Sequence, residues 1–561
     1  MNAIITEKTK QLVDDLKSIC ANHGLGNDGN EYKIITEVFL YKFMNDKFFY
    51  EIRKLEPKFS KVKNFEDTLK KLSKNDYDLL LLQLSGGVAR LKKEHYLSNL
   101  HNDQYKEQFA QYFDDTMRDI ASFNADIFSV GTSGGEKIRL FSGISNYVTE
   151  EAKRDGFCRS IINKLFECNF GEIFHEKYDF FATIFEYLIM DYNKDGGGKY
   201  AEYYTPQAVA RIISAILVKG KVSNALCYDP SAGTGSLLMS LAHEIGEDRC
   251  TIYSQDISQK SSALLRMNLI LNNLAHSLPN IIQGNTLTEP YHMKKGMSFN
   301  YIVSNPPFKL DFSEWRDSID ASKQSVVEDE NAEIKRLNKR FFAGVPKTPN
   351  KDKDKMAIYL LFLQHIISSL NANGKAAVVV PTGFITAQSG IEMKIRKRLV
   401  DEKWLKGIVS MPSNIFATTG TNVSVLFIDK QNKDDVILVD ASKLGQKVKE
   451  GKNQKNLLSN DDEQKIISAF NLSLSKAKMK DFAVVLSYDE IKAKNYSFAA
   501  GQYFDIKIAY SKITPKEFKQ KIADYSDNLN KYFKQGKKLE NEIIKNLGNL
   551  RMTGKANGKR T

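Results

Sequence analysis

The four residues Asn305-Pro306-Pro307-Phe308 place an amide, two carbonyls and an aromatic ring at the end of a short apolar run. The run, Tyr301 to Val303, is typical of a buried strand, and the prolines end it because they remove backbone donors and fix φ. An exocyclic amino group on a nucleobase attacks poorly because its lone pair is delocalised into the ring. Two acceptors, the Asn305 side-chain oxygen and the Pro306 carbonyl, would favour the tetrahedral nitrogen that frees this lone pair. Phe308 offers a ring on which an extruded base can stack. For the tetrapeptide alone, a plain strand-ending Asn-Pro turn remains an alternative.

A second polar segment, Asp229 to Ser236, follows the apolar run Ala225 to Tyr228. A strand, a glycine-containing turn and then a helix form the nucleotide-binding half of a doubly wound sheet. Gly233 and Gly235 allow the backbone to approach a ligand closely, and the segment also contains Ser231 and Thr234. The segment lacks both the GxGxxG fingerprint and the phosphate-loop Gly-Lys-Ser/Thr, so hydride transfer and ATP hydrolysis lose support.

Two further predicted strands also end in polar residues. Thr251 to Ser254 leads to Asp256, which lies about 20 residues past the glycines, the spacing at which an acid reaches ribose hydroxyls. Asn280 to Gln283 leads to Asn285. Open α/β sheets bind ligands at the carboxyl ends of their strands. Together with Asn305, these strand ends predict one composite site.

The segment Tyr204-Thr205-Pro206 precedes a predicted helix that runs to about Leu217. Thr205 is a candidate N-cap and Pro206 a candidate first helical residue. The structural interpretation of this segment is only a capped helix. In the functional interpretation, the turn before the helix is expected to contact the ligand that the glycine loop binds.

The length and composition limit the classes of protein that this sequence can encode. The 561 residues suffice for roughly three to four domains. The longest apolar runs are too short to span a bilayer, and the first residues lack the pattern of a signal peptide. The five cysteines are scattered, so neither a disulfide framework nor a metal site is expected. We therefore expect a cytoplasmic protein without a membrane partner.

The charge is basic, with a net value of +13, and is unevenly distributed. Residues 501–561 carry 14 lysines and arginines against six aspartates and glutamates. This balance fits a nucleic-acid partner, although a solvated lysine-rich helix gives the same count.

The remaining chain divides by pattern. Residues 1–165 have helical apolar spacing and form a predicted helical domain. Residues 166–505 contain all the predicted strand ends described above, and within them the charged segment 309–355 is too long for an ordinary connection. The region from Asp429 to about Leu486 gives no assignment. Residues 506–561 form a predicted helical tail, in which a capping box at Thr514 to Glu517 marks the start of a helix. The apolar stripe of this helix needs a partner helix to cover it.

These motifs resemble those of the amino-methyltransferases that use S-adenosylmethionine, and specifically the modification (M) subunit of type I DNA restriction–modification systems. The resemblance covers nearly the whole chain, and the order of its motifs is that of the adenine-N6 group. It implies an α/β class I methyltransferase fold, a Rossmann-like doubly wound sheet, with a helical N-terminal domain and a C-terminal helical tail. Asn305 to Phe308 look like the catalytic tetrapeptide.

The resemblance also assigns the cofactor site. Tyr204, Thr205 and Pro206 look like the first cofactor motif, and Asp256 matches the ribose-binding acid. Further cofactor-binding residues are expected to be Asp229, Ser231, Gly233, Thr234, Gly235, Ser236 and Asn285. Asn285 departs from the family, because many relatives have aspartate there to bind the adenine of the cofactor. Asn keeps an acceptor, so weaker binding is expected.

The resemblance implies a methyl transfer from S-adenosylmethionine to the N6 amino group of adenine in double-stranded DNA. It also implies a specificity (S) subunit that reads the sequence, with two M subunits for each S, and a restriction (R) subunit in the full complex. The segment 309–355 would be mobile beside the target base, and the tail 506–561 would serve assembly. Two alternatives remain: a catalytically silent scaffold that binds the cofactor, and a methyltransferase that acts on protein glutamine.

Overall fold

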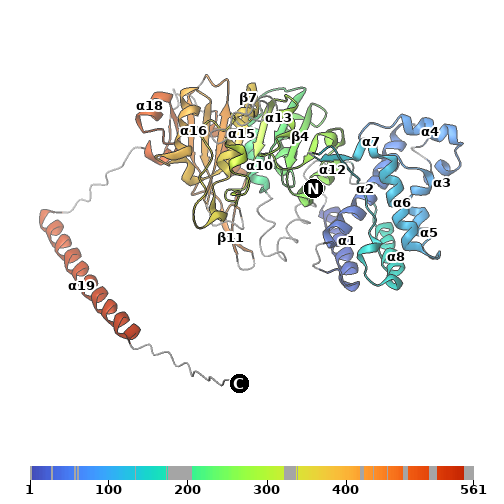
Figure 1. Ribbon diagram of the computed structural model, residues 1–561, viewed down its shortest axis with the longest axis horizontal. Coiled ribbons are helices and arrows are strands. Elements are labelled where there is room, and N and C mark those ends of the chain that lie inside the picture. The colour runs from blue at the N-terminus through green and yellow to red at the C-terminus, as the bar shows by residue number, and fades with distance from the viewer. Residues whose placement is uncertain are drawn as a thin grey trace, which may run out of the picture. The chain divides into compact units, whose positions relative to one another are not determined.

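The computed structural model of the chain describes residues 3–26, 30–55, 59, 62, 64–132, 134–171, 174, 205–320, 337, 339–416, 422–433, 435–450, 453–471, 478–504 and 514–548 (Figure 1). The chain divides into two compact units, residues 1–504 and 505–561. The first unit contains a large sheet and its helices, and the described part of the second, residues 514–548, is one long helix.

The N-terminal part of the first unit is built mainly from helices that bury large apolar residues. Phe39, Phe113 and Ile161, from three different helices, are almost wholly buried in one continuous core. The helices are α1 (Ala3–Asn22), α2 (Glu31–Leu55), α3 (Phe65–Lys70), α4 (Lys74–Leu82), α5 (Leu97–Asn102), α6 (Phe109–Phe123), α7 (Ala125–Phe128) and α8 (Glu151–Glu167).

Twelve strands of the described residues form one sheet in the order β13-β14-β10-β8-β9-β7-β6-β3-β4-β5-β1-β2. A separate hairpin joins β11 (Gln446–Glu450) and β12 (Asn453–Leu457). The strands of the sheet are β1 (Val130–Thr132), β2 (Lys137–Ile138), β3 (Ala225–Asp229), β4 (Cys250–Asp256), β5 (Ile281–Gln283), β6 (Phe299–Ser304), β7 (Leu370–Pro381), β8 (Leu405–Ser410), β9 (Val423–Asp429), β10 (Val436–Asp440), β13 (Lys478–Met479) and β14 (Ala483–Leu486).

The centre of the sheet is doubly wound, as predicted. Strands β5, β4, β3, β6 and β7 are parallel neighbours. Strand β9 runs antiparallel between β7 and β8. The chain order reverses at β3, since β4 and β5 follow on one side of it and β6 and β7 on the other. Such a reversal opens a crevice at the carboxyl ends of the strands, where ligands bind.

Helices cover both faces of this sheet, because alternate strand residues point to opposite faces. Val303 and Ala377 belong to the core that contains α10 (Gln207–Leu217), α11 (Ser236–Ile245) and α12 (Gln259–Leu271). Their neighbours Ile302 and Val378 belong to a second core with α15 (Tyr359–Ser369) and α16 (Gly390–Asp401). The short helices α13 (Tyr291–Lys294), α17 (Asn460–Ala469) and α18 (Tyr488–Ala493) complete the set in the described part of this unit.

One sheet edge comes from the N-terminal part of the chain. Strand β1 pairs in parallel with β5, through Gly131 opposite Ile282 and Thr132 opposite Gln283, and β2 pairs antiparallel with β1. The sequence indicates no strand before residue 165, because pieces of two and three residues are too short to show alternation. Within the glycine-rich stretch from Gly131 to Gly135, Gly131 and Thr132 belong to β1, whereas the sequence suggested only a break between helices.

The opposite edge of the sheet uses the region that the sequence leaves unassigned. Strand β10 pairs in parallel with β8, and β14 pairs antiparallel with β10. Ser459 and Ser487 cap α17 and α18 by accepting hydrogen bonds from Asp462 N and Glu490 N. The region thus continues the sheet of the first unit.

The helix that the structure describes in the second unit is α19 (Pro515–Gly548), which begins at the predicted capping box. Thr514 Oγ1 accepts from Glu517 N at 3.3 Å, and Glu517 Oε2 accepts from Thr514 N at 2.7 Å. Its apolar residues from Phe518 to Leu547 recur along one helix, which cannot bury them by itself. The helix runs through Gly536 without a break.

Candidate active site

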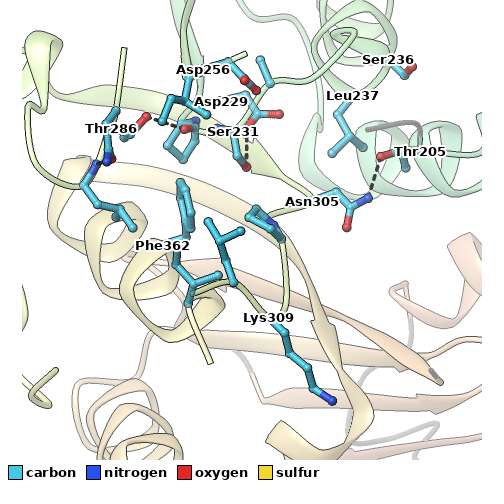
Figure 2. A pocket seen from close by; sticks show the side chains of 18 of the residues that line it. Thr205, Asp229, Ser231, Ser236, Leu237, Asp256, Thr286, Asn305, Lys309 and Phe362 are labelled. Atoms are coloured by element: carbon cyan, nitrogen blue, oxygen red, sulfur yellow. Dashed lines mark hydrogen bonds between the residues drawn. The ribbon is translucent and has the colours of Figure 1, made fainter. Parts of the chain in front are cut away.

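The ends of three parallel strands meet at a cavity of about 220 Å³ (Figure 2). Asp229 ends β3, Asp256 ends β4, and Asn305 follows β6 directly. Of the residues predicted from the sequence, eight line this cavity: Thr205, Asp229, Ser231, Ser236, Asp256, Asn285, Asn305 and Pro307. The prediction of one composite site at neighbouring strand ends therefore agrees with the geometry of the described residues.

Asp229 is held in place by a small hydroxyl network. Its Oδ1 accepts hydrogen bonds from Ser231 N and from Ser304 Oγ, each at 2.9 Å. The hydroxyls of Ser231 and Ser304 lie 2.7 Å apart and share a further hydrogen bond. Burial raises the pKa of Asp229 to about 7, since water no longer solvates the charged form. A buried carboxyl group with such a pKa at a cavity wall is typical of a ligand site.

Asp256 links the glycine loop to the next strand. Its Oδ2 accepts from Gly233 N at 2.9 Å and its Oδ1 accepts from Ser258 N at 2.8 Å. Burial raises the pKa of Asp256, although both hydrogen bonds oppose this shift. Each carboxylate oxygen still has acceptor capacity for a ligand hydroxyl.

The glycines of the loop support the site and do not line it. Gly235 has a φ of +83° and begins α11 as its N-cap. A Cβ at this position would overlap the side chain of Leu265 on α12. Asn268, also on α12, donates through Nδ2 to Thr234 O at 3.1 Å. Helix α12 therefore holds the loop in place on the side away from the cavity. The residues Gly233, Thr234 and Gly235 set the backbone path that positions Ser231 and Ser236.

Asn305 is oriented by a residue from a distant part of the chain. Its Nδ2 donates to Thr205 Oγ1 at 3.3 Å, and its amide oxygen points away from Thr205 (Figure 2). Thr205 is buried, whereas Asn305 is half-buried and reaches the cavity. The side-chain oxygen of Asn305 is thereby left as an acceptor.

The other three residues of the tetrapeptide differ in their surroundings. Pro306 is buried, and Pro307 lines the cavity. Phe308 is half-buried and packs against both cores of the first unit. Its ring meets that of Tyr359 edge-on, with the ring centres 6.3 Å apart. Phe308 is not part of the cavity wall.

The predicted cap of α10 is wrong in its details. The helix begins at Gln207, so Pro206 is the N-cap and makes no side-chain cap hydrogen bond. The hydroxyl of Thr205 instead accepts from Asn305, a partner 100 residues away that local spacing cannot reveal. Tyr204 lies outside the described residues.

The side-chain oxygen of Asn285 accepts hydrogen bonds from backbone amides of the residues that follow it. Its Oδ1 accepts from Leu287 N at 3.0 Å and more weakly from Thr288 N at 3.4 Å. The neighbouring Thr286 donates through Oγ1 to Pro230 O at 2.7 Å, which ties this turn to the glycine loop. The group of Asn285 that faces no backbone partner in this turn is its Nδ2, a donor, whereas an acceptor was expected at this position.

Several residues of the site were missed from the sequence. Ser304 supports Asp229, and its position directly before Asn305 was the available signal. Trp315 and Phe362 line the cavity. Phe362 belongs to a third buried cluster with Phe312 and Phe341, and the half-buried Trp315 packs against this cluster. Within the described parts of 309–355, the lining residues Lys309 and Leu310 are exposed, and residues 321–336 and 338 lie outside the description. Further lining residues are Pro230, Ala232, Leu237, Ile257, Thr286, Leu287, Lys309, Leu310 and Ile358.

The cavity wall suits a nucleoside-type cofactor with a cationic end. Asp229 and Asp256 offer carboxylates for an ammonium group and for hydroxyls, while Leu237, Ile257 and Leu287 offer apolar surface for a base. Among the described residues, no group of three or more His, Cys, Asp and Glu is placed to hold a metal ion. No helix in the described ranges is long and apolar enough to cross a bilayer.

The strand order and the glycine loop define the fold of a class I S-adenosylmethionine-dependent methyltransferase. The chain belongs to the N-6 DNA methylase family, whose pattern matches residues 176–510. The resemblance stated from the sequence motifs is therefore confirmed at the level of the family.

Similar proteins are methylase subunits of type I restriction enzymes. The chain is 30% identical over 360 residues to the MpnII methylase subunit of Mycoplasma pneumoniae, a match that covers 62% of this chain and 61% of that protein. It is 28% identical over 399 residues to the MjaIX methylase subunit of Methanocaldococcus jannaschii, covering 68% of this chain and 65% of that protein. The chain thus spans less than two thirds of the length of either relative.

A solved structure shows the same fold. It is the type I restriction-modification methyltransferase subunit from Streptococcus thermophilus, which superposes with a TM-score of 0.68 at 20% sequence identity. The superposition covers 89% of this chain and all of that one.

Proposed function

We propose that this chain transfers a methyl group from S-adenosylmethionine to the N6 amino group of adenine in DNA, as the modification subunit of a type I restriction–modification complex. One observation carries the proposal. The amide of Asn305 and the carboxylates of Asp229 and Asp256 line the same cavity, at adjacent ends of parallel strands. The family membership and the type I methylase relatives support the same reading.

S-adenosylmethionine, when bound, supplies a methyl group on a positively charged sulfur. We propose that Asp256 accepts ribose hydroxyls and that Asp229, held by Ser231 and Ser304, faces the cationic end. Leu237 and Ile257 would bound the adenine ring by apolar contact. Methyl transfer is an in-line displacement, so the chain has to supply proximity and charge stabilisation.

Asn305 and Pro306 would act on the target amino group. Because Nδ2 of Asn305 is engaged by Thr205, its oxygen is free to accept a hydrogen from that amine. The Pro306 carbonyl is the second acceptor in the proposal. Two acceptors favour a pyramidal nitrogen, and this makes its lone pair available for attack. Thr205 is thus a positioning residue for Asn305.

The target adenine has to leave the duplex before its N6 can reach the cavity. Phe308 is half-buried, and the contact with Tyr359 fixes its ring. We propose that the accessible part of this ring stacks on the extruded base. Stacking on an aromatic side chain contributes about 1–3 kcal/mol for each base.

We also propose partners for this chain. A specificity subunit would read the DNA sequence, with two copies of this chain for each specificity subunit, and a restriction subunit would join the full complex. The apolar stripe of α19 is flanked by lysines, among them Lys519, Lys531 and Lys534. An amphipathic helix of this kind requires a partner surface, and we propose helices of the specificity subunit.

The test is transfer of label from tritiated S-adenosylmethionine to duplex DNA, with and without a specificity subunit. Asn305→Ala should reduce N6-methyladenine formation by about two to three orders of magnitude, as for the loss of one preorganised hydrogen-bonding partner. Its affinity for the cofactor should change little, because the carboxylates stay in place.

The matched control is Asn471→Ala, which removes an exposed amide at the end of α17. This variant should transfer label at the rate of the unaltered chain. Near-normal transfer by the Asn305 variant would contradict the proposal, and label found on protein glutamine with none on DNA would replace it.

A further inference from the structure

A second cavity lies between the N-terminal helices and the methyltransferase fold. It has a volume of about 250 Å³ and shares no lining residue with the first cavity. One wall is α2, and another is the face of α12 that carries Gln259, Ser262, Ala263 and Arg266 at helical spacing. The stretch that runs from Ile138, the last residue of the edge strand β2, to Ser142 supplies further lining residues. A space of this size holds several water molecules or a small ligand.

The cavity wall is rich in cations. Lys33 from α2, Arg139 after β2 and Arg266 from α12 all line it. Arg266 is only 6% exposed, and burial lowers its pKa to about 10, so the guanidinium stays charged at neutral pH. A buried charge is costly unless an opposite charge or hydrogen bonds compensate it.

Two buried polar groups in this wall have hydrogen-bonding capacity that the described residues do not satisfy. Arg266 donates through Nη1 to Arg139 O at 2.7 Å, but its Nε has no partner among the described residues. Ser262 is 3% exposed, and its Oγ likewise has no partner within the described part of the chain. The two lie one turn apart on the same face of α12. A ligand with several acceptor oxygens would satisfy both.

The acid of this cavity compensates the cations only in part. Glu37 accepts from Ser142 Oγ at 2.9 Å and from Ser142 N at 3.2 Å. Burial raises the pKa of Glu37 to about 7, although the two hydrogen bonds from Ser142 and the charge of Arg266 oppose the rise. Near neutral pH the wall therefore carries a net positive charge.

We propose that this cavity is a binding site for a phosphate group. The acceptor oxygens of phosphate point in several directions and match guanidinium, ammonium and hydroxyl donors that come from three different elements. A carboxylate has only two oxygens and satisfies fewer of them. The phosphate belongs either to a free phosphate compound or to a nucleic-acid backbone. The site is separate from the transfer chemistry and does not rest on the proposed function.

The experiment measures inorganic phosphate binding to the full chain by calorimetry, in a chloride buffer at constant ionic strength. Arg266→Gln should weaken binding at least about tenfold, as for the loss of a charge-assisted hydrogen bond. Ser262→Ala, a milder change, should weaken it by a smaller factor. Glu37→Gln keeps an acceptor for Ser142 but removes the competing charge, so it should strengthen binding about threefold or more.

The matched control is Lys137→Gln, which removes one positive charge from the exposed edge strand two residues before Arg139. It does not line the cavity and should leave phosphate binding unchanged. Thermal unfolding of each variant checks that the chain remains folded. If Arg266→Gln unfolds, the opposite effects of Ser262→Ala and Glu37→Gln still decide the question.

A parallel titration with a short duplex, followed by fluorescence anisotropy, separates the two sources of phosphate. Duplex affinity that follows the same order of variants assigns the site to a DNA backbone phosphate. Unchanged duplex affinity, with altered phosphate binding, assigns it to a free phosphate compound. The inference is overturned if neither ligand distinguishes the variants, since the cavity then holds only water.

Discussion

Replacement of Gly235 by alanine is the most specific test of the structure, because two separate effects at this position should each lower the free energy of unfolding. Its φ of +83° lies in the left-handed region, which costs a residue with a Cβ about 1–2 kcal/mol. A Cβ there would also overlap Leu265, a fully buried residue of α12. Forcing an extra carbon into a packed core costs about 1–3 kcal/mol. We therefore expect Gly235→Ala to lower the free energy of unfolding by about 2–5 kcal/mol.

Gly220 separates the two costs. Its φ is +76°, but a Cβ there would meet nothing within 4 Å. Gly220→Ala should therefore show the backbone cost alone, about 1–2 kcal/mol. The difference between the two variants measures the contact of residue 235 with Leu265.

A double substitution tests the contact directly. Leu265→Ala alone creates a cavity and should cost about 2–5 kcal/mol. In the double variant the new methyl group of residue 235 enters the space that Leu265 leaves. The combined loss should therefore fall short of the sum of the single losses by about 1–3 kcal/mol.

Urea unfolding of the full chain, followed by circular dichroism, measures these differences. Calorimetric titration with S-adenosylmethionine runs beside it, because the displaced loop carries Ser231 and should weaken cofactor binding. Equal losses in Gly235→Ala and Gly220→Ala would refute the argument. Additive losses in the double variant would refute it as well.

Three further predictions concern the cofactor and the tail. Because the pKa of Asp229 is raised to about 7, the folded chain keeps a proton between about pH 4 and pH 7 that the unfolded chain has lost, so the free energy of unfolding falls as the pH rises through that range. Asp229→Asn should remove this slope in urea unfolding measured at a series of pH values. An unchanged slope would contradict the prediction. Asn285→Asp keeps one side-chain oxygen for Leu287 N and adds a second acceptor. If this turn contacts the amino group of the cofactor, calorimetry should show an affinity for S-adenosylmethionine that is about tenfold higher. Reduced affinity would show that the cofactor uses the Asn285 donor instead. Truncation after Ile513 should leave a chain that binds S-adenosylmethionine but no longer assembles with the specificity subunit proposed above, as measured by light scattering. Assembly by the truncated chain would exclude α19 as the contact with that subunit.

The parts of the site that were predictable from the sequence are those that local pattern encodes. A buried strand followed by a glycine turn or by an Asn-Pro pair identifies its own end, and the predicted strands match β3 to β6 within two residues at either end. The doubly wound order then places these ends at one edge. Asp229, Asp256 and Asn305 were identified in this way.

The rest depends on contacts between distant residues. Nothing near Thr205 indicates that its hydroxyl accepts from Asn305 and does not cap α10. The overlap that keeps residue 235 a glycine comes from Leu265, which is 30 positions away. The donor left on Asn285 follows from which backbone amides reach its oxygen. Such features are decided by packing, which spacing alone does not specify.

Strand β1, next to the sheet edge, bears on the order in which the chain folds during synthesis. Gly131 pairs with Ile282, so the ribosome makes about 150 more residues after β1 before its partner exists. The early helices have local contacts and can form as they emerge, whereas parallel pairing across such a distance has to wait. Until β5 arrives, the short hairpin of β1 and β2 is an unpaired edge, the kind of backbone that invites pairing with another chain. The pairing of β1 with β5 therefore removes an exposed strand edge through which the nascent protein could associate with another chain.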